Sequence, residues 1–278
     1  MLPGVYSAKK KDGTIYYRSS ITYKSKHISL GSFDSEYSAN QAYIIAAEII
    51  KGSDSIENSF YRTYALSFEK IVSLINFRDN NMYIPTPIYL RKNYFSYYLD
   101  INHELKFDIE DLFYYSSHKI MKRQGHLFVN DYGMQVTILG RFGIKPHAVC
   151  GKDYIFENGD STDMRYSNIK IINPYHGVSL IHTKSGNLFR VKLHINGNYT
   201  IGEYKTVNEA AIAYNKAADL AKDHGIERSF FENYIEDLSP KEYARIYTEL
   251  DISPKFLQYL KRQEENRNEK ESFMFGFC

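Results

Sequence analysis

The sequence predicts an α+β fold in which two modules, each a three-stranded antiparallel sheet plus one helix, flank a central α+β domain and are followed by C-terminal helices. Short motifs recur roughly 170 residues apart, β-rich runs alternate with tight-turn pairs, and a helical alanine stripe follows each group of runs. The 278 residues, 43% of them hydrophobic, are enough for two or three folded domains. We place an N-terminal module at 1–63, a connector with the central domain at 64–173, a second module at 174–234 and C-terminal helices at 235–278.

Three pairs of matching segments define the repeat. Gly4-Val5 recurs as Gly177-Val178, Leu30–Phe33 as Ile201–Tyr204, and Ile56–Phe60 as Ile226–Phe230. In the first copy the turn pairs Asp12-Gly13 and Lys24-Ser25 separate the predicted strands Gly4–Lys10, Tyr16–Tyr23 and Lys26–Phe33. In the second copy Ser185-Gly186 and Asn196-Gly197 separate Gly177–Ile181, Leu188–Ile195 and Asn198–Tyr204.

A helix is predicted after each set of strands, because the apolar positions follow one helical spacing. They are Ala39, Ala42, Tyr43, Ala46, Ala47 and Ile50 in the first copy and Ala210, Ala213, Tyr214, Ala217, Ala218 and Ala221 in the second. Asp34 or Ser35 can cap the first helix, and Thr206 with Glu209 matches a capping box for the second.

Strand alternation predicts which side chains point away from each helix. The outward positions are Tyr6, Ala8, Lys10, Arg18, Ser20, Thr22, His27 and Ser29 in the first copy and Ser179, Ile181, Thr183, Arg190, Lys192, His194, Asn198 and Thr200 in the second. They include cations and hydroxyls but no carboxylate, and we expect the carboxylates, Glu203 among them, mostly in loops and helices. Two positive surfaces follow, although the net charge is only +2.

Such a β-ribbon surface suits the major groove of double-stranded DNA, where these side chains can contact base edges and phosphates. The candidate DNA-binding residues are Tyr6, Lys9, Lys10, Arg18, Ser20, Thr22, His27, Ser29, Ser179, Thr183, Arg190, Lys192, His194, Asn198 and Thr200. A solvated sheet face would also lack apolar residues, so this pattern alone leaves that alternative open.

The stretches LGSFDSEYSANQAYIIAAEI and IGEYKTVNEAAIAYNKAADL resemble the Apetala-two/ethylene-response-factor DNA-binding domain, over residues 3–52 and 176–225. The resemblance implies DNA contacts at Tyr6, Ser20, Thr22, His27, Ser29, Ser179, Lys192, His194, Asn198 and Thr200. The family commonly has Arg and Trp at several of these positions. The smaller groups here imply a different target sequence.

The central domain contains a second motif, Asp153–Ile169, after a predicted strand and helix start at Leu105–Asp111 and an extended run at Gly125–Val129. The motif resembles the ββα core of HNH endonucleases, which in phages and mobile elements often accompany an Apetala-two domain. The matching residues are Asn158, Gly159, Asp160, Asp163, Arg165 and Asn168.

Two chemical positions of this motif are altered. Phe156 occupies the position of the general-base histidine and Met164 that of the central asparagine. A phenyl ring cannot accept a proton, and a thioether is a poor Mg²⁺ ligand. We therefore predict a retained scaffold without catalytic residues, metal or cofactor, in which Asn158-Gly159 forms a turn and Asp163 and Asn168 bond to backbone.

Further elements are expected in the connector and the C-terminal segment. The connector should contain a helix, Phe68–Phe77, and a strand, Tyr94–Leu99. Ser239-Pro240 and Ser253-Pro254 signal helix starts, with helices to Leu250 and to about Asn266.

Composition excludes other chemistries. Cys150 and Cys278 cannot form a disulfide framework, His147 with Cys150 is too few ligands for zinc, and no phosphate-binding loop is found. No stretch reads as a membrane span or signal peptide, so we expect a cytoplasmic protein without a membrane partner.

The leading hypothesis is sequence-specific double-stranded DNA binding by a phage or mobile-element regulator. One alternative is a homing-type HNH endonuclease or nickase that uses Mg²⁺ with Asp153, Asp160, Asp163 or Asn168. Another is a mobile-element protein that binds and inhibits a host nucleic-acid enzyme, with a protein as its partner. Nicking of supercoiled plasmid distinguishes the first alternative, and co-purification with a protein partner and no DNA distinguishes the second.

Overall fold

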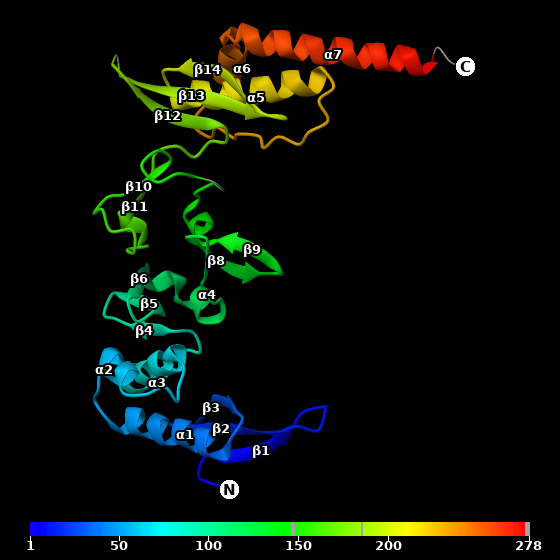
Figure 1. The fold of residues 1–278 in the computed structure, drawn as a ribbon. Coiled ribbons are helices and arrows are strands. Elements are labelled where there is room, and N and C mark those ends of the chain that lie inside the picture. Colours follow the sequence, from blue (N-terminus) through cyan, green and yellow to red (C-terminus); the bar gives the residue numbers. More distant parts are fainter. Residues whose placement is uncertain (146–147, 185, 276–278) are drawn as a thin grey trace. The chain divides into compact units, whose positions relative to one another are not determined.

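The computed structural model describes residues 1–145, 148–184 and 186–275. It has the predicted α+β class, with several small antiparallel sheets and helices that include C-terminal ones (Figure 1). The chain forms two compact units, Met1–Ile138 with Phe156–Ile169, and Leu139–Ile155 with Lys170–Cys278. Ser185 of the predicted turn, His147 and Cys278 lie outside the described residues.

The first unit begins with the predicted meander. Strands β1 (Val5–Lys9), β2 (Ile15–Tyr23) and β3 (Lys26–Phe33) form an antiparallel sheet in the order β1-β2-β3. Helix α1 (Glu36–Lys51) follows, and the hydroxyl of its N-cap Ser35 accepts a hydrogen bond from the Ser38 N–H. The strand prediction is confirmed to within a residue at each end, because turn chemistry sets these boundaries locally.

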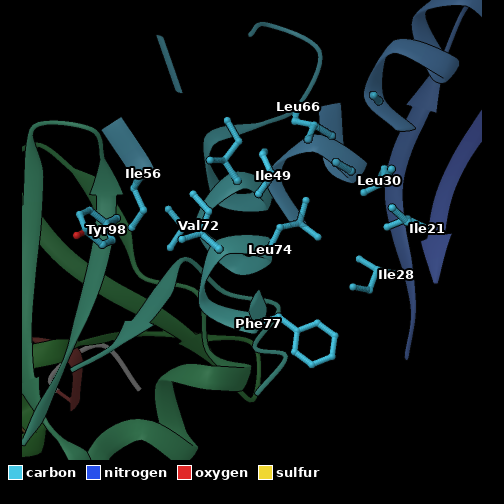
Figure 2. Packing of buried hydrophobic residues seen from close by; sticks show 14 residues of the cluster. Ile21, Ile28, Leu30, Ile49, Ile56, Leu66, Val72, Leu74, Phe77 and Tyr98 are labelled. Atoms are coloured by element: carbon cyan, nitrogen blue, oxygen red, sulfur yellow. The ribbon is translucent and has the colours of Figure 1, made fainter. Parts of the chain in front are cut away.

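One face of this sheet is buried. Ile28 is 1% exposed, and the stripe alanines Ala42 and Ala46 of α1 are fully buried in the same cluster. Helix α2 (Ile56–Tyr61) and helix α3 (Phe68–Asn80) extend the cluster. Figure 2 shows Leu74 and Phe77 of α3 on the side to which Ile28 of the sheet points.

The stretch of chain between the two meanders is built from short elements, which are divided between the two units. The predicted strand Tyr94–Leu99 and the strand running into a helix start are confirmed. The elements are β4 (Ile88–Leu90), β5 (Tyr94–Asp100), β6 (His103–Asp108), the 3₁₀ helix Ile109–Asp111, α4 (Leu112–Ser117), β7 (Met121–Arg123), β8 (His126–Asp131), β9 (Met134–Thr137), the 3₁₀ helix Ile138–Phe142, β10 (Tyr154–Phe156), the 3₁₀ helix Tyr166–Asn168 and β11 (Ile169–Ile171). They make the sheets β4-β5-β6, β7-β8-β9 and β10-β11.

The second unit contains the second meander. Strands β12 (Val178–Thr183), β13 (Gly186–His194) and β14 (Asn198–Tyr204) form an antiparallel sheet, and helix α5 (Val207–Asp223) carries the predicted Thr206–Glu209 capping box. The alanine stripe of α5 is buried with Val191, Leu193 and Ile201 of the strands. The repeat is therefore a repeat of structure as well as of sequence.

Two helices complete this unit, α6 (Pro240–Glu249) and α7 (Pro254–Phe275). Phe256 and Leu260 of α7 belong to the core cluster of β13, β14 and α5, and the Ser253 N–H donates to the Ile201 carbonyl at 2.8 Å. The predicted end of α7 near Asn266 is wrong. The helix continues to Phe275 because the charged stretch after Lys261 consists mostly of good helix formers, Lys, Arg, Gln and Glu. Within the described ranges, no helix combines the length and apolar content that crossing a membrane requires.

Candidate nucleic-acid interface

We call the side of the β1-β2-β3 sheet that faces away from α1 the first face. Arg18, Thr22, His27 and Ser29 are exposed on it, Ser20 is partly exposed, and Tyr6 is 38% exposed. The inward neighbours Ile21, Ile28 and Leu30 are buried, as the alternation predicts. The lysines expected to contact phosphate, Lys9 and Lys10, are exposed at the end of β1.

The second face is the corresponding side of the β12-β13-β14 sheet, away from α5. Lys192, His194, Asn198, Thr200 and Thr183 are exposed there, and Ser179 and Arg190 are partly exposed. Helix α7 packs with the buried side of the sheet, because Phe256 joins the cluster of α5 rather than the polar side chains. The described helices of this unit therefore leave the second face open.

Several polar groups on the second face already have partners. The Ser179 hydroxyl donates to the Arg190 carbonyl at 3.3 Å, and the Thr183 hydroxyl donates to the Gly186 carbonyl at 2.7 Å. His194 Nδ1 lies 3.0 Å from the Asn198 side-chain oxygen across the β13–β14 pair. Lys192 pairs across the same strands with Thr200.

A β-bulge recurs in both sheets and sets the register of the two faces. The register shifts between Ser19 and Ser20 in β2 and between Val191 and Lys192 in β13. Each bulge lies in the third strand, where one extra residue, Leu30 or Ile201, is accommodated without a cross-strand partner. Beyond the bulge, every side chain of that strand lies on the face opposite to the one that simple alternation predicts.

The bulge overturns one expectation about charge. Glu203 does not lie in a loop, because it belongs to β14 and pairs in register with Arg190. Arg190 Nε and Nη2 lie 2.9 and 2.7 Å from Glu203 Oε1. The second face therefore carries a carboxylate, bound to the arginine that was expected to be available for DNA.

The corresponding position of the first face is different. Arg18 pairs across the strands with Tyr6 on one side and Ser32 on the other. Its guanidinium donates to the Tyr16 hydroxyl at 2.8 Å and lies 5.4 Å from the centre of that ring. Within the described ranges Arg18 has no carboxylate partner, and β1, β2 and β3 contain neither Asp nor Glu.

The HNH-like segment is held together by its own retained polar residues. The Asn168 side-chain oxygen accepts from the Asn158 N–H at 2.9 Å, and its amide donates to the carbonyl of Asp163 at 2.8 Å. Arg165 Nη2 donates to the Asp163 carboxylate at 2.6 Å and the Arg165 N–H donates to it at 3.3 Å, and these bonds from Arg165 lower the pKa of the Asp163 carboxyl. Gly159 has a φ of +76°, as the predicted turn requires. The predicted bonds of Asp163 and Asn168 to backbone are confirmed.

The Asp160 carboxylate also accepts hydrogen bonds from nearby residues. Its carboxylate accepts from the Thr162 hydroxyl at 2.6 Å and the Thr162 N–H at 2.9 Å, and Lys106 Nζ lies 3.2 Å away. These donors, the Thr162 hydroxyl first, lower the pKa of Asp160 to about 2. The carboxylate therefore stabilises the loop as an anion.

Asp153, the remaining nuclease candidate, has a separate set of partners in the second unit. Lys145 Nζ lies 3.0 Å from its carboxylate, the Asn173 amide donates to it at 3.0 Å, and the Val149 N–H donates at 2.8 Å. Burial lowers the pKa of the Lys145 ammonium, an effect that Asp153 opposes. This buried ion pair joins segments of the chain within that unit and presents no open ligand position.

Neither altered HNH position supplies replacement chemistry. Phe156 is half-buried and Met164 is 6% exposed. Among the residues that the structure describes, no cluster of three or more His, Cys, Asp or Glu side chains could hold a metal ion. The four nuclease candidates are each engaged in bonds that shape the backbone around them.

Comparison with known proteins adds no family assignment. The chain matches no protein-family model, no curated protein and no solved structure. The likenesses to the Apetala-two and HNH families remain predictions from sequence.

Proposed function

We propose that this protein binds double-stranded DNA through the first and second faces, and that both contribute to sequence-specific binding. The proposal rests on one observation above all: in a single chain, two sheets of the same topology leave open surfaces rich in cations, hydroxyls and imidazoles, with Glu203 as the one carboxylate in their six strands. Side chains of these kinds bind phosphate oxygens and base edges, and a β-ribbon fits the major groove.

The first face carries the stronger case. Arg18 and His27 lie among exposed hydroxyls, and Lys9, Lys10 and Lys26 are exposed at its margins. Since its strands contain no acid, a phosphate approaching this sheet meets no like charge from it. A sheet face that only contacts water does not require the exclusion of acidic residues, because acidic and basic side chains are hydrated equally well.

The HNH-like segment is proposed to act as a structural part of the chain. Asp160, Asp163 and Asn168 would each have to break existing bonds before they could bind a metal ion. This argument favours DNA binding without strand cleavage.

The test is the salt dependence of duplex binding by the full chain. If the two faces together neutralise about six phosphates, the slope of log affinity against log salt should be roughly −5 or −6. Arg18→Ala and Lys192→Ala should each reduce the magnitude of this slope by about 0.9, because each removes one phosphate contact. Fluorescence anisotropy of a labelled random-sequence duplex at several salt concentrations measures both quantities.

Matched controls lie on the opposite side of each sheet. Lys51→Ala in the last turn of α1 and Lys222→Ala in the last turn of α5 remove the same charge without touching either face. They should leave the slope within about 0.3 of the unsubstituted chain. A slope near −1, or equal effects of face and control variants, would exclude this function.

A further inference from the structure

The two faces differ at one corresponding place, and the difference concerns charge. The residue trio Tyr6, Arg18 and Ser32 lies side by side across β1, β2 and β3. The equivalent trio across β12, β13 and β14 is Ser179, Arg190 and Glu203. The bulge lies at the same point of each sheet, so the arginines correspond in position, and the third member is a hydroxyl in one trio and a carboxylate in the other.

We propose that Glu203 is a positioning residue that holds Arg190 away from phosphate, so that the first face supplies the larger share of the phosphate contacts and the Arg190–Glu203 pair of the second face contacts base edges. This inference rests on the proposed function and assigns unequal roles to its two faces.

The geometry supports the first half of this assignment. Two guanidinium nitrogens share one carboxylate oxygen, at 2.7 and 2.9 Å, so the pair carries no net charge towards a ligand. The Arg190 side chain is 40% exposed and the Glu203 side chain is 38% exposed, so DNA bound to the second face could contact both. A phosphate that approached Arg190 would have to displace the Glu203 carboxylate, which is negatively charged like the phosphate itself.

Chemistry supports the second half. An arginine donates to the acceptors of guanine in the major groove, and a glutamate accepts from the amino group of cytosine. An Arg–Glu pair held side by side can therefore satisfy neighbouring base edges that present both donors and acceptors. Among the residues that the structure describes, Arg18 contacts the neutral Tyr16 side chain and no carboxylate, so its full charge remains available to a phosphate.

The experiment exchanges the two residues in the full-length chain. Glu203→Ser introduces the residue of the first face, and Ser32→Glu introduces the carboxylate of the second. The probes are a random-sequence duplex and the duplex that the unsubstituted chain selects from a random pool. Affinities are measured at 50 and 200 mM salt by anisotropy, and thermal unfolding by circular dichroism checks that each variant is folded.

Glu203→Ser should release Arg190 to one phosphate. The affinity ratio between the two salt concentrations should then rise about three- to fourfold, as a slope change of ~0.9 requires, and preference for the selected duplex should fall. Ser32→Glu should lower the affinity for random duplex and make the slope shallower. Adding Arg190→Ala to Glu203→Ser should restore the original slope. This double variant distinguishes the release of Arg190 from the loss of repulsion between the Glu203 carboxylate and phosphate, because only the first effect requires Arg190.

The outcomes separate the two proposals. If the unsubstituted chain shows the expected slope but Glu203→Ser changes neither slope nor preference, the positioning role is wrong and DNA binding stands. The role is equally wrong if the double variant keeps the slope of Glu203→Ser. If the unsubstituted chain has a slope near −1, the proposed function fails and this inference fails with it.

Discussion

At the scale of single residues, partners rather than residue types decide what each polar side chain can do. Arg18 and Arg190 are the same residue in the same strand position, yet one contacts a phenol and the other a carboxylate. Asp160 and Asp163 match positions of a nuclease motif, but donors within a few residues occupy both. A motif match therefore identifies a site only when its polar atoms are available.

The pH dependence of stability tests the structural role of Asp160. Its pKa is lowered to about 2 in the folded chain, so the ionised form stabilises the fold above the unfolded pKa near 3.8, and this contribution is lost as pH falls through about 2. Asp160→Asn should lower the unfolding free energy at pH 6, by about 1 kcal/mol or less because water screens a partly exposed group. The deficit should shrink as the pH falls from about 4 towards 2.

Urea unfolding at a series of pH values measures this deficit. Thr162→Val, which removes the principal donor and keeps the carboxylate, should produce a smaller deficit with the same pH dependence. A deficit that is constant between pH 6 and pH 2 would mean that the charge of Asp160 contributes nothing to the loop.

At the scale of elements, the repeat is defined by a contact between strand and helix. Gly4 and Gly177 have φ values of +71° and +70°, and a Cβ at either position would lie 2.1 Å from Tyr43 or 2.2 Å from Tyr214. The Gly4 carbonyl accepts from the Ser20 N–H at the bulge, and the Gly177 carbonyl accepts from the Lys192 N–H at 2.8 Å. Glycine, helix tyrosine and bulge form one arrangement, which explains why these landmarks recur together.

Gly177→Ala should therefore strongly destabilise the second unit. The substitution forces a left-handed backbone on alanine and drives its methyl group into the Tyr214 ring and the Lys192 carbonyl, at a combined cost of about 3 kcal/mol or more. Thermal unfolding followed by circular dichroism should show a transition at clearly lower temperature. Gly197→Ala is the control, because a Cβ there meets no atom within 4 Å and φ is not in the left-handed range. Equal midpoints for the two variants would contradict this account of the repeat.

For the full chain, the presence of two faces predicts that both can bind one DNA duplex at the same time. Each face lies in its own compact unit, and each unit has its own core, of which Ile28 and Val191 are members. Linked modules bind more tightly than either alone when both can engage one ligand, because the second event becomes intramolecular.

Selection of bound duplexes from a random pool tests this bivalent binding. We expect two enriched motifs at a fixed separation, because two distinct faces then engage one duplex. The double variant Lys192→Ala with Thr200→Ala, on the second face, should lose one motif and keep the other. A single enriched motif that survives in this variant would show that the second face does not bind DNA.

Sequence reasoning located most local elements correctly. Turn pairs, the Thr206–Glu209 capping box and the alanine stripes act between residues close in the chain, so they predict strands and helices to within a few residues. The end of α7 was missed because no breaker marks it and the helix simply continues. The outward positions on β2 and β13 also follow from alternation alone.

Short-range spacing in the sequence is enough to predict the two meanders, their helices and the polar character of their outer faces. Contacts between residues distant in sequence place Glu203 opposite Arg190, pair Asp153 with Lys145 and bring α7 into the second core, and no local pattern predicts them. A bulge moves a side chain from one face to the other without changing the composition of the strand, and its position depends on pairing with a neighbouring strand. Partners distant in sequence therefore set which charges remain available to a ligand.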